Sequence, residues 1–141
     1  MLAPILDVTD VIDHAAEAVI SNGLDRFNDE YVGYGDRQPM AVTVRDPESG
    51  DVIGGAIGRS SLGLGFLDLF YLPPALRRQG IGTKVLQAFE DECRRRGCRS
   101  AVVYTISFQA PKFYERNGWT KFGDIPCAPP GTSRVFLSKM L

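Results

Sequence analysis

A short basic segment in the middle of the chain has the composition of a phosphate-binding turn. It reads Arg77-Arg78-Gln79-Gly80-Ile81-Gly82-Thr83 and separates an apolar run from a predicted helix. The first N–H groups of a helix have no partner within it and carry partial positive charge. Glycines at positions 80 and 82 have no Cβ atom, so a phosphate can approach these donors closely. Because each ionic hydrogen bond contributes about 1.5–3 kcal/mol, the segment could hold a diphosphate without a metal ion.

A simpler explanation of the two glycines is that they ease a tight passage from strand to helix. Two better-known phosphate loops do not fit the segment. A Walker loop requires lysine directly after its last glycine, whereas Thr83 stands between Gly82 and Lys84. The Rossmann pattern requires a third glycine where Val85 stands. The segment therefore predicts a diphosphate site of another kind.

The size and charge of the chain exclude several classes of protein. Its 141 residues suffice for a single domain, residues 1–141, with its own core. The formal net charge of −1 gives no general attraction to nucleic acid. The chain has neither a basic, apolar leader nor an apolar run near the ~20 residues that span a bilayer. We therefore expect a cytoplasmic protein without a nucleic-acid or membrane partner.

Metal chemistry is not indicated by the residues that could support it. The single histidine, His14, falls in a predicted helix, and the spacing of Cys93, Cys98 and Cys127 matches no metal site. We expect no metal and interpret the cysteines as small buried apolar residues. The basic run 94–96 near a helix end is interpreted as a solvated face.

The elements around the basic turn form a mixed α/β pattern. Residues 65–72 are an almost continuous apolar run, typical of a strand covered on both faces. Beyond the turn, apolar residues recur at helical spacing from residue 81, and Gly97 closes that helix. Residues 101–105 predict a second buried strand, and residues 111–117 a short helix with an early proline.

The flanking segments complete this order. Residues 40–45 and 52–59 predict a hairpin, and residues 119–122 and 133–139 a closing pair of strands. Nearer the N-terminus, four shorter elements are expected from periodicity and turn residues. They are a strand at 2–6, a helix from Thr9 or Asp10 to Gly23, a helix at 24–28, and a loop at 30–38.

Two motifs on this frame resemble those of the GNAT family of N-acetyltransferases. Arg77-x-x-Gly80-x-Gly82 is similar to the family's acetyl-CoA-binding motif, and Ala110-x-x-Phe113-Tyr114-x-x-x-Gly118-Trp119 to its second motif. The order of elements resembles the family over the whole chain. The resemblance implies a GNAT-like acyl-CoA N-acyltransferase fold, a mostly antiparallel central sheet splayed at its middle and flanked by helices. Ser107 departs from the family's usual asparagine, so that residue's role is not transferred.

The resemblance also implies an activity, the transfer of an acetyl group from acetyl-CoA directly to a primary amine of a small molecule, peptide or protein. A homodimer is a further family expectation. In the family, strand backbone at the splay pairs with the pantetheine arm of the donor, and backbone N–H near Leu72 meets the oxyanion. The residues expected to bind acetyl-CoA are Phe70, Tyr71, Leu72, Arg77, Arg78, Gln79, Gly80, Ile81, Gly82, Thr83 and Tyr114.

Two residues are candidates for catalysis. Neutralising a lysine-like amine at pH 7 costs roughly 4.6 kcal/mol, so a proton acceptor is needed. Asp68 is the only acid of the 65–72 run and falls where several family members carry a glutamate base. We expect it to be buried, or else paired with a neighbouring arginine or a backbone donor. Tyr114 matches the family tyrosine that faces the coenzyme sulfur. Its ordinary pKa of about 10 lies near a thiol's ~8.5, which favours proton sharing with the leaving thiolate. The alternative is that Tyr114 packs its ring in the core and has no catalytic role.

The acceptor and the broad class of function remain open at this level. Acidic residues of the 30–38 loop and of the segment before the last strand would attract a cationic amine, although an ordinary polar loop explains them equally well. A non-catalytic acyl-CoA-binding sensor would need the same basic turn. Amine-dependent release of free thiol distinguishes the enzyme from the sensor. The residues in question are Asp29, Glu30, Tyr31, Tyr34, Asp36 and Asp124.

Overall fold

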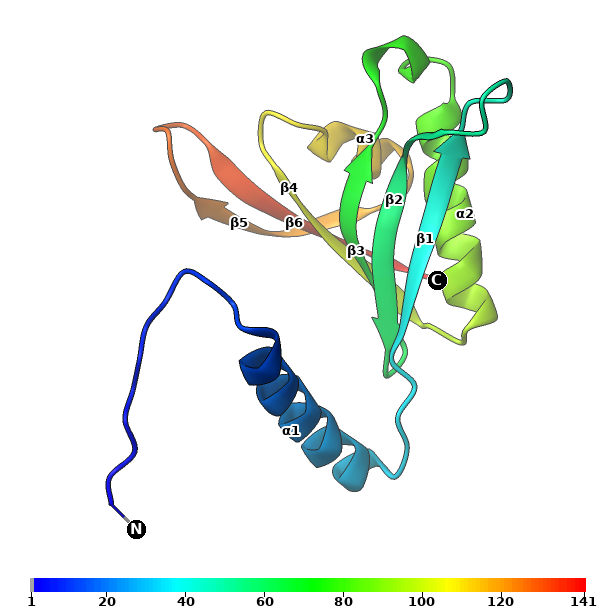
Figure 1. The fold of residues 1–141 in the computed structure, drawn as a ribbon. Helices are drawn as coiled ribbons and strands as arrows, with labels where there is room; N and C mark the ends of the chain where they lie inside the picture. The colour runs from blue at the N-terminus through cyan, green and yellow to red at the C-terminus, as the bar shows by residue number, and fades with distance from the viewer. Residues whose placement is uncertain (1) are drawn as a thin grey trace. The chain divides into compact units, whose positions relative to one another are not determined.

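The computed structural model of the protein describes residues 2–141 (Figure 1). The chain divides into two compact units, an N-terminal one that ends at Gly35 and a larger one, Asp36–Leu141. Within residues 2–141, no helix combines the length and the apolar character that crossing a bilayer demands.

The N-terminal unit contains one long helix, α1 (His14–Val32). Asp13 caps it by accepting a hydrogen bond from Ala15 N–H at 3.4 Å, and Gly33 ends it in the left-handed conformation at φ 94°. The predicted strand at 2–6, the early helix start and the break at Gly23 are therefore wrong. An interior glycine costs only about 1 kcal/mol relative to alanine, which does not stop a helix that continues on both sides.

The larger unit is built on a six-stranded sheet in the order β1-β2-β3-β4-β6-β5. Only β3 and β4 run parallel, and the other neighbours are antiparallel, as predicted. Its strands are β1 (Gln38–Arg45), β2 (Val52–Ser61), β3 (Leu64–Tyr71), β4 (Ser100–Ile106), β5 (Thr120–Pro126) and β6 (Ser133–Met140).

Two helices follow the parallel strands, α2 (Ile81–Arg95) after β3 and the short α3 (Pro111–Arg116) after β4. The predicted apolar stripe of α2 is confirmed, since Leu86, Phe89 and Cys93 have no exposed surface. This stripe packs on β1 and β2. Gly97 adopts φ 82° directly after the helix, as its predicted role at the helix end requires.

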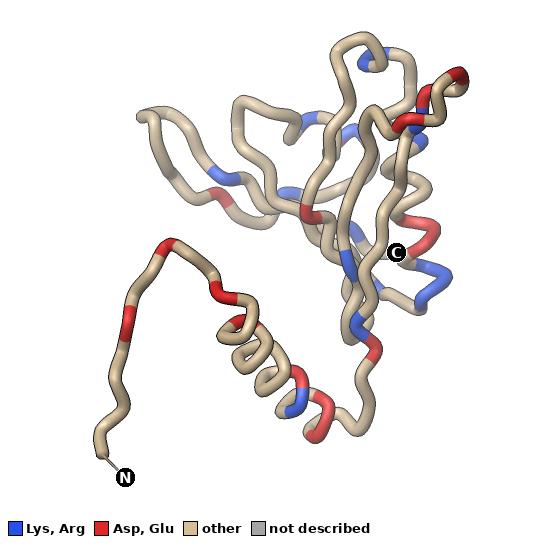
Figure 2. Tube along the Cα trace, in the orientation of Figure 1, with Lys and Arg blue, Asp and Glu red and all other residues tan. Residues whose placement is uncertain are grey.

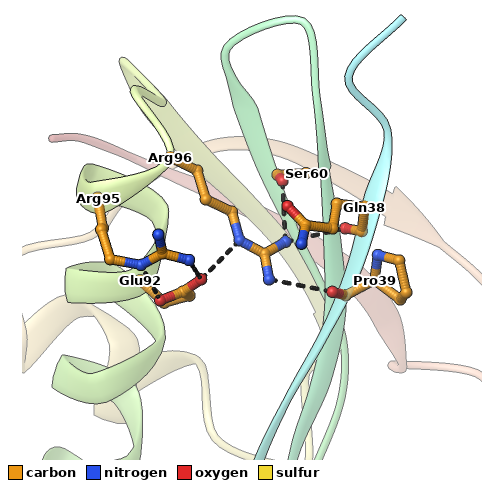
Figure 3. A network of polar contacts seen from close by, with 6 residues as sticks. All are labelled: Gln38, Pro39, Ser60, Glu92, Arg95 and Arg96. Atoms are coloured by element: carbon orange, nitrogen blue, oxygen red, sulfur yellow. Dashed lines mark hydrogen bonds and ion pairs between the residues drawn. The ribbon is translucent and has the colours of Figure 1, made fainter.

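Arg96, just after α2, joins this helix to the sheet (Figure 3). Its guanidinium donates to the Glu92 carboxylate, to the Gln38 and Pro39 carbonyls and to the Ser60 hydroxyl. The interpretation of the basic run as a solvated face is therefore wrong for Arg96, whose side chain is 12% exposed. The C-terminal end of α2 is thus fixed to β1 and β2.

Candidate functional site

The two parallel strands separate halfway along their length. Their pairing runs from Leu64 opposite Ser100 to Leu67 opposite Val103 and then stops. Beyond that point β3 continues beside β2, and β4 continues beside β6 (Figure 1). We call residues 68–71 and 104–106 the splayed segment. Here the two strands offer backbone groups that they do not use on each other, so the predicted splay is confirmed.

A β-bulge interrupts the register of β3 at the start of the splayed segment. Leu67 pairs with Gly58 and Leu69 with Ile57, which leaves Asp68 as the extra residue. Leu67 is buried, whereas the Asp68 side chain is 46% exposed. The expectation that Asp68 is buried is wrong, because one face of this part of β3 is exposed: Asp68 and Leu69 both reach solvent, although the apolar run suggested a strand covered on both faces.

The Asp68 carboxylate instead meets an arginine, which was the alternative interpretation. Arg59 Nε on β2 lies 3.6 Å from Asp68 Oδ2. The Arg59 guanidinium also lies 4.1 Å from the centre of the Phe66 ring, where the ring attracts a cation. Arg59 was missed by sequence reasoning, since only the strand register brings it beside residue 68. Both side chains are about half exposed, so the carboxylate remains reachable from solvent.

The basic turn between β3 and α2 is braced by its own side chains. Arg77 Nε donates to the Leu72 carbonyl at 3.0 Å, and Gln79 Nε2 donates to the Ala75 carbonyl at 2.8 Å. Gly80 precedes α2 with φ 78°, a left-handed conformation that favours glycine. Apart from Gly80 and its two chain neighbours, no atom of the described residues lies within 4 Å of the position that a Cβ atom of Gly80 would take. The predicted open approach to the helix start is therefore present at Gly80.

The N-terminal turn of α2 has the electrostatics of an anion site. Its first helical hydrogen bond runs from Lys84 N–H to the Gly80 carbonyl, so the N–H groups of residues 81–83 have no acceptor one turn earlier. The turn contains no acidic residue. Gly82 has a packing role as well, because its Cβ atom would lie 3.2 Å from the Phe113 ring of α3. Packing against α3 is therefore a reason for a glycine at position 82 that the sequence did not indicate.

Tyr114 of α3 lies among aromatic rings on the α2 side of the sheet. It makes edge contacts with Phe70, Phe113 and Trp119 at centroid distances of 5.2–6.5 Å. The residue is buried, and burial raises the pKa of Tyr114 to about 12. This widens the gap to a thiol's ~8.5, which weakens the predicted proton sharing. In the part of the chain that the structure describes, no buried polar side-chain atom lacks a hydrogen-bond partner.

Within the larger unit, the two acids predicted to attract an amine do not form a cluster. Glu30 and Tyr31 belong to α1 rather than to a loop. In the larger unit, Asp36 lies just before β1 and accepts a hydrogen bond from Leu62 N–H at 2.9 Å. Asp124 lies in β5, at the opposite edge of the sheet, and pairs with Lys121 at 2.8 Å. Strand order, which the sequence does not reveal, keeps these two carboxylates apart.

The turn from β4 to α3 is held by residues whose role the motif did not show. Gln109 Oε1 accepts hydrogen bonds from the Thr105 hydroxyl and from Ile106 N–H, each at 3.0 Å. The Ser107 hydroxyl accepts a hydrogen bond from Ser133 N–H at 3.0 Å. Ser107 thus joins the end of β4 to β6, a structural role that differs from that of the asparagine usual at this position in the family.

Comparison with known proteins agrees with this geometry. A model of the Acetyltransferase (GNAT) family matches residues 9–119. Acetyltransferase Atu2258 of Agrobacterium fabrum is 35% identical over 132 residues, 94% of this chain and 96% of that protein. Blasticidin-S acetyltransferase of Streptomyces morookaense is 34% identical over 95 residues, 67% of this chain and 70% of that protein. The crystal structure of an Agrobacterium tumefaciens protein assigned as an acetyltransferase matches with a TM-score of 0.89 at 33% identity, covering 98% of this chain and 100% of that one.

Proposed function

Because the chain belongs to the GNAT family of acetyltransferases, we propose that it transfers the acetyl group of acetyl-CoA directly to a primary amine. Enzymes of this family use acetyl-CoA as the acetyl donor. The observation that carries the proposal is the splayed segment beside the N-terminal turn of α2. Unused strand backbone and an anion site follow each other along β3 and the turn after it.

The residues present fit the donor substrate. The N–H groups of residues 81–83, with the open position at Gly80, suit the diphosphate. The backbone of Phe70, Tyr71 and Leu72 suits the amides of the pantetheine arm. Arg77 acts as a brace, since its Nε holds the Leu72 carbonyl. Arg78 and Gln79 complete the rim of the turn.

Two side chains on opposite faces of the sheet would assist the reaction. The amine nitrogen attacks the thioester carbon, the C–N bond forms, and the C–S bond breaks as the sulfur leaves with the electron pair. Asp68, on the exposed face, accepts the proton that the nitrogen loses, directly or through water. Tyr114, with its pKa raised to about 12, remains protonated and donates a hydrogen bond to the departing sulfur.

A small-molecule amine is the acceptor that we favour among the primary amines. One relative that covers 67% of this chain is named for blasticidin S, an antibiotic. The Arg59–Asp68 pair also leaves a carboxylate that solvent can reach at the splayed segment. An acceptor panel should therefore contain antibiotic amines, polyamines and a lysine peptide.

The test is release of free thiol from acetyl-CoA across this panel, with mass detection of the acetylated amine. We expect thiol release that depends on one or more amines, and at least a tenfold lower kcat in Asp68→Asn and Tyr114→Phe with coenzyme binding retained. Asp51→Asn, an acid of the exposed β1–β2 turn, is the matched control and should behave like the wild type. Coenzyme binding without thiol release for any amine would favour the sensor and contradict the proposal.

A further inference from the structure

A second basic site lies beside the anion site of α2. A cavity of about 310 Å³ opens where the β4–α3 turn meets α3. Its lining includes the side chains of Lys112, Phe113 and Arg116. Figure 2 shows basic residues both in α3 and in the turn before α2. The proposed acetyl transfer uses neither cation.

The two cations of this cavity are not satisfied by the protein. Within the described residues 2–141, neither the Lys112 ammonium nor the Arg116 guanidinium takes part in an ion pair or a side-chain hydrogen bond. Their spacing of four residues places both on one face of α3, where like charges repel by a few tenths of a kcal/mol. In contrast, Arg59, Lys121 and Lys139 each pair with a carboxylate. The arrangement therefore suits an anion supplied from outside.

The cavity adjoins the diphosphate site through one aromatic ring. Phe113 lines the cavity, and the same ring lies 3.2 Å from the Cβ position of Gly82 in the first turn of α2. In coenzyme A, a 3′-phosphate is attached to the ribose that carries the diphosphate. If the diphosphate of coenzyme A lies at the start of α2, its 3′-phosphate lies one ribose ring away. That separation is comparable to the size of the Phe113 side chain that lies between the two sites.

We propose that Lys112 and Arg116 bind the 3′-phosphate of coenzyme A and so distinguish it from its dephosphorylated form. The inference rests on the proposed function, which puts the diphosphate at α2. A phosphate dianion at this site would interact with two cations, and Arg116 can bind it through two parallel N–H hydrogen bonds. The site gives the enzyme selectivity for the donor at a distance from the reacting thioester.

Calorimetric titration with coenzyme A and with 3′-dephospho-coenzyme A tests this site without any need for turnover. We expect the wild type to bind coenzyme A at least tenfold more tightly than the dephospho form, a difference of about 1.4 kcal/mol. In Lys112→Ala and Arg116→Ala this ratio should fall towards one, while affinity for the dephospho form stays unchanged. Arg45→Ala, which removes one cation at the β1–β2 turn, is the control and should keep the wild-type ratio.

Three results would overturn the proposal. The wild type would bind both compounds equally, the two variants would lose affinity for both alike, or Arg78→Ala rather than the α3 variants would abolish the ratio. Each of these leaves the proposed acetyl transfer standing, because the wild type still binds coenzyme A. Failure of the wild type to bind either compound would instead overturn the proposed function together with this site.

Discussion

The Phe113 ring of α3 lies 3.2 Å from the place where a Cβ atom of Gly82 would stand at the start of α2. One contact therefore joins the two motifs that the sequence places thirty residues apart. It also means that a substitution at Gly82 disturbs packing as well as any ligand. Gly80, whose Cβ position is open, is the better residue for testing the anion site.

Gly80→Ala should weaken coenzyme A binding by tenfold or more. The added methyl group enters the space in front of the first N–H groups of α2 and strains a backbone at φ 78°. Gly97→Ala is the matched control, because Gly97 has φ 82°, an equally open Cβ position and a place at the other end of the same helix. Both variants should lose about 1–2 kcal/mol of stability. Equal affinity of the two variants for coenzyme A would contradict the anion site.

Tyr114 should stay protonated well above the pH at which a free tyrosine ionises. Its pKa is raised from 10.0 to about 12 by burial, so the stability it contributes is fully present below pH 10 and is lost as pH rises towards 12. Alkaline spectrophotometric titration should show one of the five tyrosines ionising late, and Tyr114→Phe should remove that step. A wild-type rate that falls between pH 9 and 10, but does not fall in Tyr114→Phe, would contradict this assignment.

The three cysteines should divide into one reactive and two protected thiols. Cys93 and Cys98 are buried, and burial is the main cause that raises the pKa of both, to about 12 for Cys93, whereas Cys127 is exposed. A thiol reagent should modify one group in the native protein and three after unfolding. Cys127→Ser should abolish the native reaction, and this variant also suits the thiol-release assay because it lowers the background. The expected burial of the cysteines is therefore confirmed for Cys93 and Cys98 and wrong for Cys127. Rapid modification of two native thiols would contradict the burial of Cys93 and Cys98.

Arg96→Met should destabilise the larger unit, although the partners of Arg96 lie outside the anion site. The change leaves the buried Ser60 hydroxyl without its donor and frees two carbonyls at the start of β1. One unsatisfied buried group costs about 1–3 kcal/mol, which chemical denaturation can measure. Arg95→Met is the neighbouring control, since the Arg95 side chain is 68% exposed and pairs only with Glu92. A cost for Arg95→Met as large as that for Arg96→Met would contradict the role given to Arg96.

The stability of the protein at acid pH should depend on the ionisation of Glu92. Hydrogen bonds from Arg95, which has the larger effect, and from Arg96 lower the pKa of Glu92 to about 2. A lowered carboxylate pKa gives stability that is present above the ordinary value of 4.5 and is lost as pH falls towards 2. Glu92→Gln should therefore flatten the acid limb of the stability curve, measured by thermal unfolding between pH 5 and pH 2. An unchanged acid limb would show that the pairing does not contribute.

The sequence by itself determined the order of strands and helices in the larger unit, because those segments carry their own periodicity and end signals. The stripe of α2, its end at Gly97 and the proline at the start of α3 are local features. The basic turn and the Phe113-Tyr114 motif were local in the same sense, so the family could be inferred from them. At the N-terminus the same reasoning failed, since Gly23 resembled a helix end although residues on both sides favoured helix.

Only the tertiary structure decided which side chains meet. The exposed face of β3 that carries Asp68, the pairing of Asp68 with Arg59, and the separation of Asp124 from Asp36 all depend on strand register and strand order. Register and order are set by packing between segments distant in sequence, and no local pattern encodes them. The cavity of Lys112 and Arg116 exists for the same reason, because α3 contacts the first turn of α2 only in the folded chain.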